Sequence, residues 1–123
     1  MNLVVDASAV LAVLLGEKEN SKVVLTLAKA ESLLSPMIIF YEVLNGLKYG
    51  VTRKRLIKEE AGEAWEKFRE LGIEMIEQEG EAEAIFELAC DRNISVYDAA
   101  YIVLAKKFKC QLLSLDKRLA ELV

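Results

Sequence analysis

A chain of 123 residues, 54% of them hydrophobic, is long enough to bury a core of its own, and we expect one domain over residues 1–123. The formal net charge of −4 disfavours a nucleic-acid binder that relies on a general basic surplus. The absence of histidine excludes imidazole bases, Ser-His nucleophile pairs and His-based zinc sites, so any catalysis must depend on carboxylates.

The sequence carries no mark of export or of membrane insertion. It has no run of eighteen apolar residues and no signal-peptide pattern, and we expect a cytoplasmic protein without membrane contact. Cys90 and Cys110 lack the spacing of a metal site. In a reducing compartment they are expected to be buried thiols, with a disulfide as the alternative.

The first expected element is a strand over residues 2–5. It is a short apolar run that ends at Asp6 and Ser8, as in a buried strand that passes into a helix at an N-cap. Asp6 is therefore expected at the carboxyl end of a central strand, where ligands bind in open α/β sheets. A short apolar helix over 8–15 follows and ends at Gly16.

The remaining elements alternate along the chain. Further strands are expected at 32–34, 73–76 and 110–114, and helices at 19–30, 37–49, 53–71, 81–92, 95–107 and after Asp116 to the end at Val123. Ser35 and Pro36 have the pattern of a helix cap and first helical position, while Gly50 and Gly72 are expected to end helices. Helices between all strands predict an α/β fold around a parallel sheet of about four strands.

Four carboxylates stand out, although each has an ordinary structural explanation. Asp6 and Asp116 follow strands and precede helices, where aspartate is a favoured cap, and Asp98 is spaced to complete a capping box with Ser95. Glu42 is harder to explain in this way, because it lies within a helix on an apolar face.

Considered together, these carboxylates suggest a metal site. If the first and last strands are neighbours, Asp6 and Asp116 emerge side by side, and nearby helices can add Asp98 and Glu42. Four carboxylates without Arg, Lys or His partners would repel one another unless a cation lies among them. Oxygen ligands favour Mg²⁺ or Mn²⁺ over zinc. The polar residues spaced to support the site are Ser8, Ser114 and Asn45, the last equally explained as a surface residue.

Four short motifs resemble those of a known protein family. They are Val-Val-Asp-Ala-Ser, Phe-Tyr-Glu-Val-Leu, Tyr-Asp-Ala-Ala-Tyr-Ile-Val-Leu-Ala and Leu-Leu-Ser-Leu-Asp, in this order. From residue 3 to about 119 the chain resembles a PIN domain of the VapC type. The resemblance implies a three-layer α/β/α fold and a Mg²⁺- or Mn²⁺-dependent endoribonuclease, usually a toxin that a small VapB antitoxin neutralises and that forms a homodimer or higher homo-oligomer. By position, it implies an acidic catalytic and metal-binding quartet of Asp6, Glu42, Asp98 and Asp116, accompanied by the hydroxyls of Ser8 and Ser114.

Two features depart from that pattern. Many relatives have a further short strand after the last aspartate, whereas this sequence stops at Val123, so we expect the sheet to lack that edge. Some relatives also carry an acidic residue just after the last aspartate, where this chain has Leu119 and only later Glu121. The second departure concerns the occupancy of a second metal position.

An RNA substrate would need cationic anchors near the carboxylates. The candidates are Lys48, Arg53, Lys54 and Arg55 on one side and Lys106, Lys107, Lys109, Lys117 and Arg118 on the other, although each is equally explained as solvated surface. Tyr49 and Tyr97 could stack on bases, but packing is the more usual role of such side chains.

Other functions stay open at this stage. A non-catalytic PIN-like scaffold for RNA or protein would be expected to lack an acidic position, and none is lacking here. A housekeeping RNA-processing nuclease is a second alternative, but such proteins generally carry extra domains. A phosphatase with Asp6 as nucleophile usually has a second aspartate two residues later, where this chain has Ser8. Glycine-rich nucleotide-binding motifs are absent from the sequence.

Overall fold

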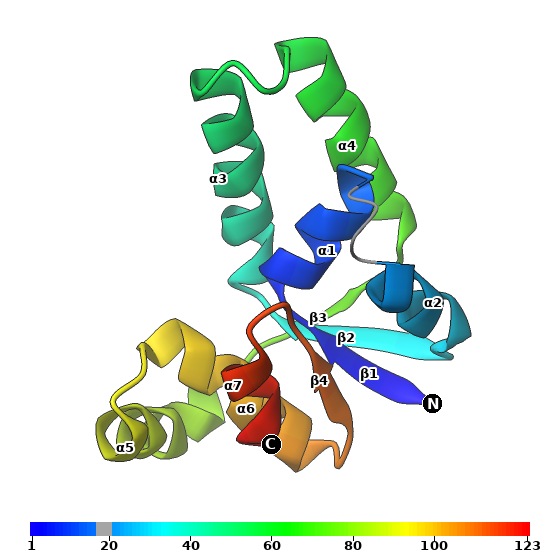
Figure 1. Cartoon of the computed structure of the whole chain (residues 1–123). Helices are drawn as coiled ribbons and strands as arrows, with labels where there is room; N and C mark the ends of the chain where they lie inside the picture. The colour runs from blue at the N-terminus through cyan, green and yellow to red at the C-terminus, as the bar shows by residue number, and fades with distance from the viewer. Residues whose placement is uncertain (17–20) are drawn as a thin grey trace.

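The computed structural model describes residues 1–16 and 21–123, which form a parallel sheet covered by helices on both faces (Figure 1). The strands, in the order β3-β2-β1-β4, are β1 (Asn2–Val5), β2 (Ser32–Pro36), β3 (Glu74–Ile76) and β4 (Gln111–Leu113). All neighbouring strands are parallel. The predicted three-layer α/β/α architecture with four strands is confirmed for the described part of the chain.

The helices divide between the two faces of the sheet. One layer contains α1 (Ala7–Leu14), α2 (Ser21–Lys29), α3 (Ile39–Thr52) and α4 (Lys58–Glu70). The other contains α6 (Val96–Lys107) and α7 (Lys117–Glu121), with α5 (Ala82–Arg92) packed against α6 and preceded by the 3-10 turn η2 (Glu79–Glu81). The first part of the helix predicted at 19–30 lies outside the described residues.

The first strand is buried on both faces, as its apolar run predicts. Leu3 and Val5 face α1, α3 and α4, whereas Val4 faces α6, and all three are at most 1% exposed. In register, Leu3 pairs with Leu33 on one side and with Gln111 on the other. Because β1 lies between β2 and β4, Asp6 leaves the sheet near the middle of its carboxyl edge.

The helix start predicted at Ser35 and Pro36 is wrong. Both residues belong to β2, where Ser35 pairs with Met75 and is completely buried, and its hydroxyl donates to the Pro36 carbonyl at 3.0 Å. The helix begins at Ile39 without a side-chain cap. Pairing of β2 with β3 extends the strand by two residues beyond the predicted end, which a local capping pattern cannot reveal.

The long helix predicted over 53–71 is also wrong at its start. The preceding helix α3 continues past Gly50 to Thr52. The missing side chain of this glycine leaves room for Leu56, whose Cδ1 lies 2.7 Å from where a Cβ would be. Lys54 then takes a left-handed conformation with φ 59°. The next helix starts only after Ile57, whose backbone N–H donates to Glu60 at 2.9 Å. Ile57 is consequently 59% exposed.

Two predictions about cysteines and membranes can be compared with the structure. Cys90 and Cys110 are both free thiols; Cys90 is exposed and Cys110 partly buried, so the expectation of burial is wrong for Cys90. Within residues 1–16 and 21–123, no helix combines the length and apolar character required to span a membrane.

Candidate active site

Asp6 lies directly after β1 and caps the N-terminus of α1. Its Oδ1 accepts hydrogen bonds from the backbone N–H of Ala9 at 3.0 Å and from the Ser8 hydroxyl at 2.6 Å. Both bonds involve Oδ1, and no hydrogen bond from the described residues reaches Oδ2. Since the side chain is only 7% exposed, these contacts hold the carboxylate in one orientation with one oxygen available for a ligand.

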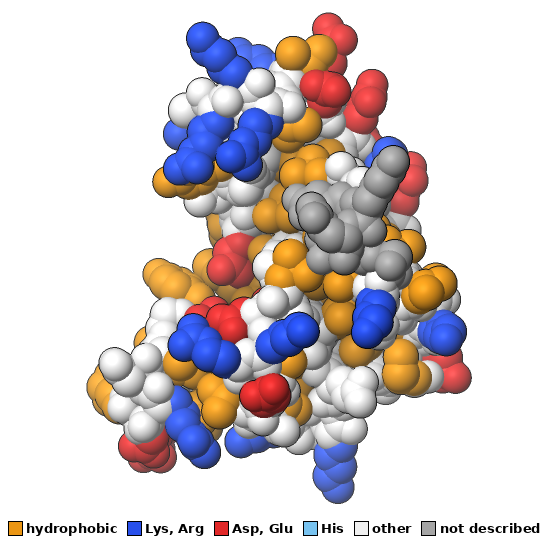
Figure 2. Space-filling model, in the orientation of Figure 1, with side chains coloured by type: hydrophobic (Ala, Val, Ile, Leu, Met, Phe, Trp, Pro, Cys, Tyr) orange, Lys and Arg blue, Asp and Glu red, His pale blue; other side chains and the backbone are white. Residues whose placement is uncertain are grey.

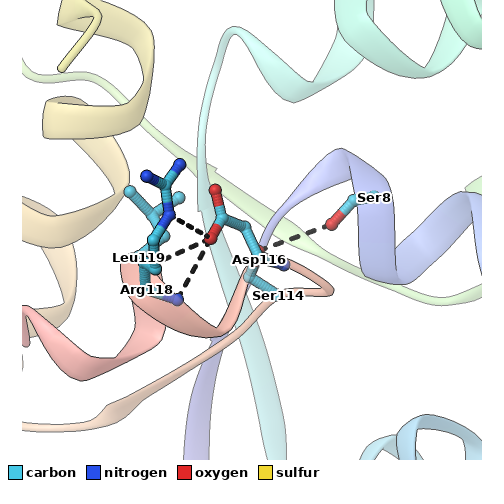
Figure 3. A network of polar contacts seen from close by, with 5 residues as sticks. All are labelled: Ser8, Ser114, Asp116, Arg118 and Leu119. Atoms are coloured by element: carbon cyan, nitrogen blue, oxygen red, sulfur yellow. Dashed lines mark hydrogen bonds and ion pairs between the residues drawn. The ribbon is translucent and has the colours of Figure 1, made fainter.

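Asp116 follows β4 and caps α7 in the same manner (Figure 3). Its Oδ1 accepts from the backbone N–H groups of Arg118 at 3.0 Å and Leu119 at 3.4 Å. The Arg118 Nε lies 3.7 Å from the same oxygen. The expectation that the carboxylates have no cationic partner is therefore wrong for Asp116. The ion pair is weak, because the Arg118 side chain is 92% exposed.

Two serines join these aspartate loops across the sheet edge (Figure 3). The Ser8 hydroxyl accepts from the Leu115 backbone N–H at 3.0 Å, and the Ser114 hydroxyl accepts from the Asp116 N–H at 3.0 Å. The two hydroxyls are 3.5 Å apart. Ser8 therefore contacts both the Asp6 carboxylate and the loop that carries Asp116, and fixes their relative position.

Glu42 reaches the same edge from the first turn of α3 and contacts Tyr101 of α6. The Tyr101 hydroxyl donates to Glu42 Oε1 at 2.5 Å, and Tyr101 is only 2% exposed. Burial raises the Glu42 pKa, the Tyr101 hydrogen bond lowers it, and the charges of Asp6 and Asp98 raise it further, with a net upward shift. Burial and the Glu42 contact together raise the pKa of the tyrosine far above its ordinary value.

Sequence reasoning did not identify Tyr101 as part of the site. A tyrosine among the apolar residues of a helix is more commonly part of the core than part of a site. One available signal was spacing: Tyr101 comes three residues after Asp98, which places both on one helix face.

Asp98 lies in the first turn of α6. Its backbone N–H donates to the Ser95 hydroxyl at 3.0 Å, while the reciprocal carboxylate bond of a capping box is not among the hydrogen bonds of the described residues. Burial raises the Asp98 pKa, contact with the Ser95 hydroxyl lowers it, and the charges of Asp116 and Asp6 raise it. Arg118 counteracts part of this rise, and the net shift is upward.

The structure brings the predicted residues together around one cavity of about 420 Å³. Its lining includes Asp6, Ser8, Glu42, Asp98, Tyr101 and Asp116. Figure 2 shows acidic side chains gathered in the hollow between the upper helices and the lower layer. Ser114 does not line the cavity but supports the Asp116 loop from below. The four carboxylates come from two strand ends and two helices that are distant in sequence.

Comparison with known proteins identifies the family of this chain. Residues 3–123 match the PIN domain. The chain is 37% identical to a protein named Ribonuclease VapC3 from Pyrobaculum aerophilum, over 98% of this chain and 94% of that protein. It is 34% identical to VapC ribonuclease Mb0985 from Mycobacterium bovis, over 97% and 89% of the two chains. The chain belongs to the PIN domain family.

The resemblance drawn from the four sequence motifs is therefore confirmed. The crystal structure of PAE2754 from Pyrobaculum aerophilum shares the PIN fold of this chain with a TM-score of 0.76, covering 100% of this chain and 85% of that one. Because its sequence identity is only 21%, it supports the fold alone.

The chemistry of this PIN domain cavity suits a hard divalent cation. All the donors are oxygens. Beyond the effect of burial, the charges of neighbouring carboxylates raise the pKa of Glu42 and of Asp98, a repulsion that a bound cation would relieve. Within the described residues, no three acidic or cysteine side chains lie close enough to hold one ion directly. The arrangement thus fits a cation that keeps several waters and takes one or two carboxylates, as Mg²⁺ commonly does.

The lysines and arginines predicted to anchor RNA do not all lie near the four carboxylates. Lys117 and Arg118 begin α7 directly after Asp116. Lys106, Lys107 and Lys109 lie at or beyond the far end of α6, about 13 Å along the helix from Asp98, and Lys107 pairs with Glu81. Of the second group, the structure therefore brings only Lys117 and Arg118 to the vicinity of the carboxylates.

Proposed function

We propose that this PIN domain is a Mg²⁺- or Mn²⁺-dependent endoribonuclease of the VapC toxin type, which hydrolyses RNA phosphodiester bonds. The observation that carries the proposal is the convergence of Asp6, Glu42, Asp98 and Asp116 on one cavity. The relatives named VapC ribonucleases, at 34% and 37% identity over nearly the full chain, support the choice of RNA as substrate.

Each side chain has a separate task in this reaction. Asp6, with Oδ1 held by Ser8 and Ala9, presents Oδ2 as a ligand, and Asp98 presents its carboxylate from the facing helix. When bound, the cation supplies an acidified water and positive charge beside the phosphate. Glu42 keeps Oε1 on Tyr101, and its raised pKa suits it to take a proton from the attacking water or to add a ligand. Lys117 and Arg118 bind the RNA backbone next to Asp116.

The VapC assignment also suggests partners. We propose a small VapB-like antitoxin as the natural inhibitor and a homodimer or higher homo-oligomer as the working form, with the cytoplasm as the compartment. The names of the relatives support the antitoxin, and two free thiols are compatible with a reducing compartment. Light scattering on the purified protein measures the oligomer directly.

The test of the nuclease proposal is cleavage of a structured RNA by the purified protein. Cutting is expected with Mg²⁺ or Mn²⁺, and loss of cutting is expected with EDTA and in Asp6→Asn and Asp98→Asn. The matched control is Asp91→Asn, because Asp91 is exposed on α5 and does not line the cavity. Cutting that survives EDTA, or that is lost equally in the Asp91 variant, would contradict the proposal.

A further inference from the structure

A second cavity adjoins the acidic one and shares Glu42 with it. Its volume is about 550 Å³, within the range of small-molecule sites. Helix α3 contributes Tyr41, Leu44, Asn45 and Lys48 to the lining, and the first turn of α6 contributes Tyr97. We call this cavity the tyrosine pocket. Because both cavities include Glu42, a strand of nucleic acid can occupy them in succession.

The two tyrosines have the same sequence position relative to a site carboxylate. Tyr41 directly precedes Glu42, and Tyr97 directly precedes Asp98, so two of the four site carboxylates follow an exposed aromatic residue that lines this pocket. Their side chains are 66% and 58% exposed. Rings this exposed bury little apolar surface and so contribute little to stability, but they offer flat faces on which a planar ligand can stack.

The polar groups of the tyrosine pocket lie on the same face of α3. Asn45 follows Tyr41 by one turn, and Lys48 follows by about another. An asparagine amide provides both a donor and an acceptor, as the edge of a nucleobase requires, and an exposed lysine suits a phosphate. Beyond Lys48, the Arg53 guanidinium lies 4.9 Å from the Tyr49 ring centre and continues the positive charge.

The surface next to the tyrosine pocket is apolar, unlike the pocket itself. A neighbouring cavity is lined by Met37, Ile38, Phe40, Tyr41 and Met75, which include no charged side chain. Such a surface suits an apolar protein partner, whereas the tyrosine pocket combines aromatic faces, an amide and a cation next to the carboxylates. The combination favours a nucleotide as its occupant.

We propose that the tyrosine pocket is a nucleobase subsite, in which Tyr41 and Tyr97 hold the unstacked base of the nucleotide next to the phosphate in the acidic cavity. The inference rests on the proposed ribonuclease function and adds a specificity element to it. A base paired and stacked in a duplex is not available to this pocket, so the subsite selects unpaired segments of RNA.

The test measures RNA binding apart from cleavage. In an Asp6→Asn background, with Mg²⁺ present, fluorescence anisotropy gives the affinity for a short randomised single-stranded RNA. Tyr41→Leu and Tyr97→Leu are each expected to weaken binding about fivefold or more, as loss of base stacking does. The matched control is Phe86→Leu, which removes an equally exposed ring, 64% exposed on α5, away from the pocket. Photocrosslinking of the same RNA containing 4-thiouridine should label Tyr41 or Tyr97.

The outcomes separate this inference from the proposed function. Selective loss in the two tyrosine variants, with crosslinks to these rings, supports the subsite. Unchanged affinity in those variants overturns it, even where the wild-type protein cuts RNA. Unchanged affinity together with loss of self-association, measured by light scattering, also overturns it and assigns the pocket to a protein interface. If the wild-type protein neither binds nor cuts RNA, the proposed function fails and the subsite with it.

Discussion

The hydrogen bond between Tyr101 and Glu42 allows a quantitative prediction. Tyr101→Phe keeps the ring, which is 2% exposed, and removes only the hydroxyl that donates to Glu42 Oε1 at 2.5 Å. A hydrogen bond to a charged group contributes about 1.5–3 kcal/mol to folding. Glu42 is half-buried and lines a cavity, so water can replace part of this contact, and we expect a loss of about 1–1.5 kcal/mol. For a chain of this size that corresponds to a decrease in Tm of roughly 4–6 °C.

A double-mutant cycle in urea unfolding tests whether the loss belongs to this contact. In a Glu42→Ala background, Tyr101→Phe is expected to be neutral or stabilising, because the buried hydroxyl has then lost its carboxylate partner. Tyr97→Phe, on the same helix but 58% exposed, is the control and should change stability by less than about 0.5 kcal/mol. An equal cost of Tyr101→Phe in both backgrounds, or no cost in either, would refute the reasoning.

Three further predictions concern charge, capping and the core. Without metal, the raised pKa of Asp98 means that its contribution to stability is fully present below the ordinary pKa of 3.8 and is lost as pH rises through the pKa of the folded state. Asp98→Asn should therefore raise the Tm at about pH 7 and raise it less at about pH 4. The control Asp91→Asn should change the Tm at neither pH. Ser95→Ala should cost about 1 kcal/mol in urea unfolding through loss of the α6 cap, a cost that Ser95→Thr should largely avoid. Phe68→Ala, at a position 3% exposed, should cost about 3–5 kcal/mol, whereas Phe86→Ala should have little effect, and similar costs for both would contradict the assigned core.

The sequence was informative where chemistry depends on local pattern. An apolar run followed by an aspartate predicted both the buried strand β1 and the position of Asp6. The prediction that Asp6 and Asp116 lie side by side depended on the first and last strands being neighbours, and no local sequence pattern indicates that. The pairing of Val5 with Leu113 supplies that condition, and the hydrogen bond from Asp6 N to Leu113 O at 3.1 Å extends it into the site.

The errors arose where tertiary contacts outweigh local preference. Ser35 and Pro36 have the composition of a helix start, yet pairing with β3 keeps them in the sheet. Gly50 has the composition of a helix end, yet its lack of a side chain serves the close packing of Leu56. Tyr101 could not be predicted as a site residue for a related reason. The sequence of an apolar helix does not distinguish a core tyrosine from one whose hydroxyl donates a hydrogen bond to Glu42.

The two explanations considered for the aspartates, helix cap and metal ligand, are compatible in this structure. Asp6 and Asp116 both direct their capping contacts to Oδ1, and no hydrogen bond from the described residues reaches the Oδ2 atoms. A cap on one oxygen fixes the rotamer and so orients the other, which lowers the entropy cost of binding a cation. Capping therefore does not argue against catalysis at such positions. It is the means by which a strand-to-helix junction can hold a carboxylate ready for a ligand.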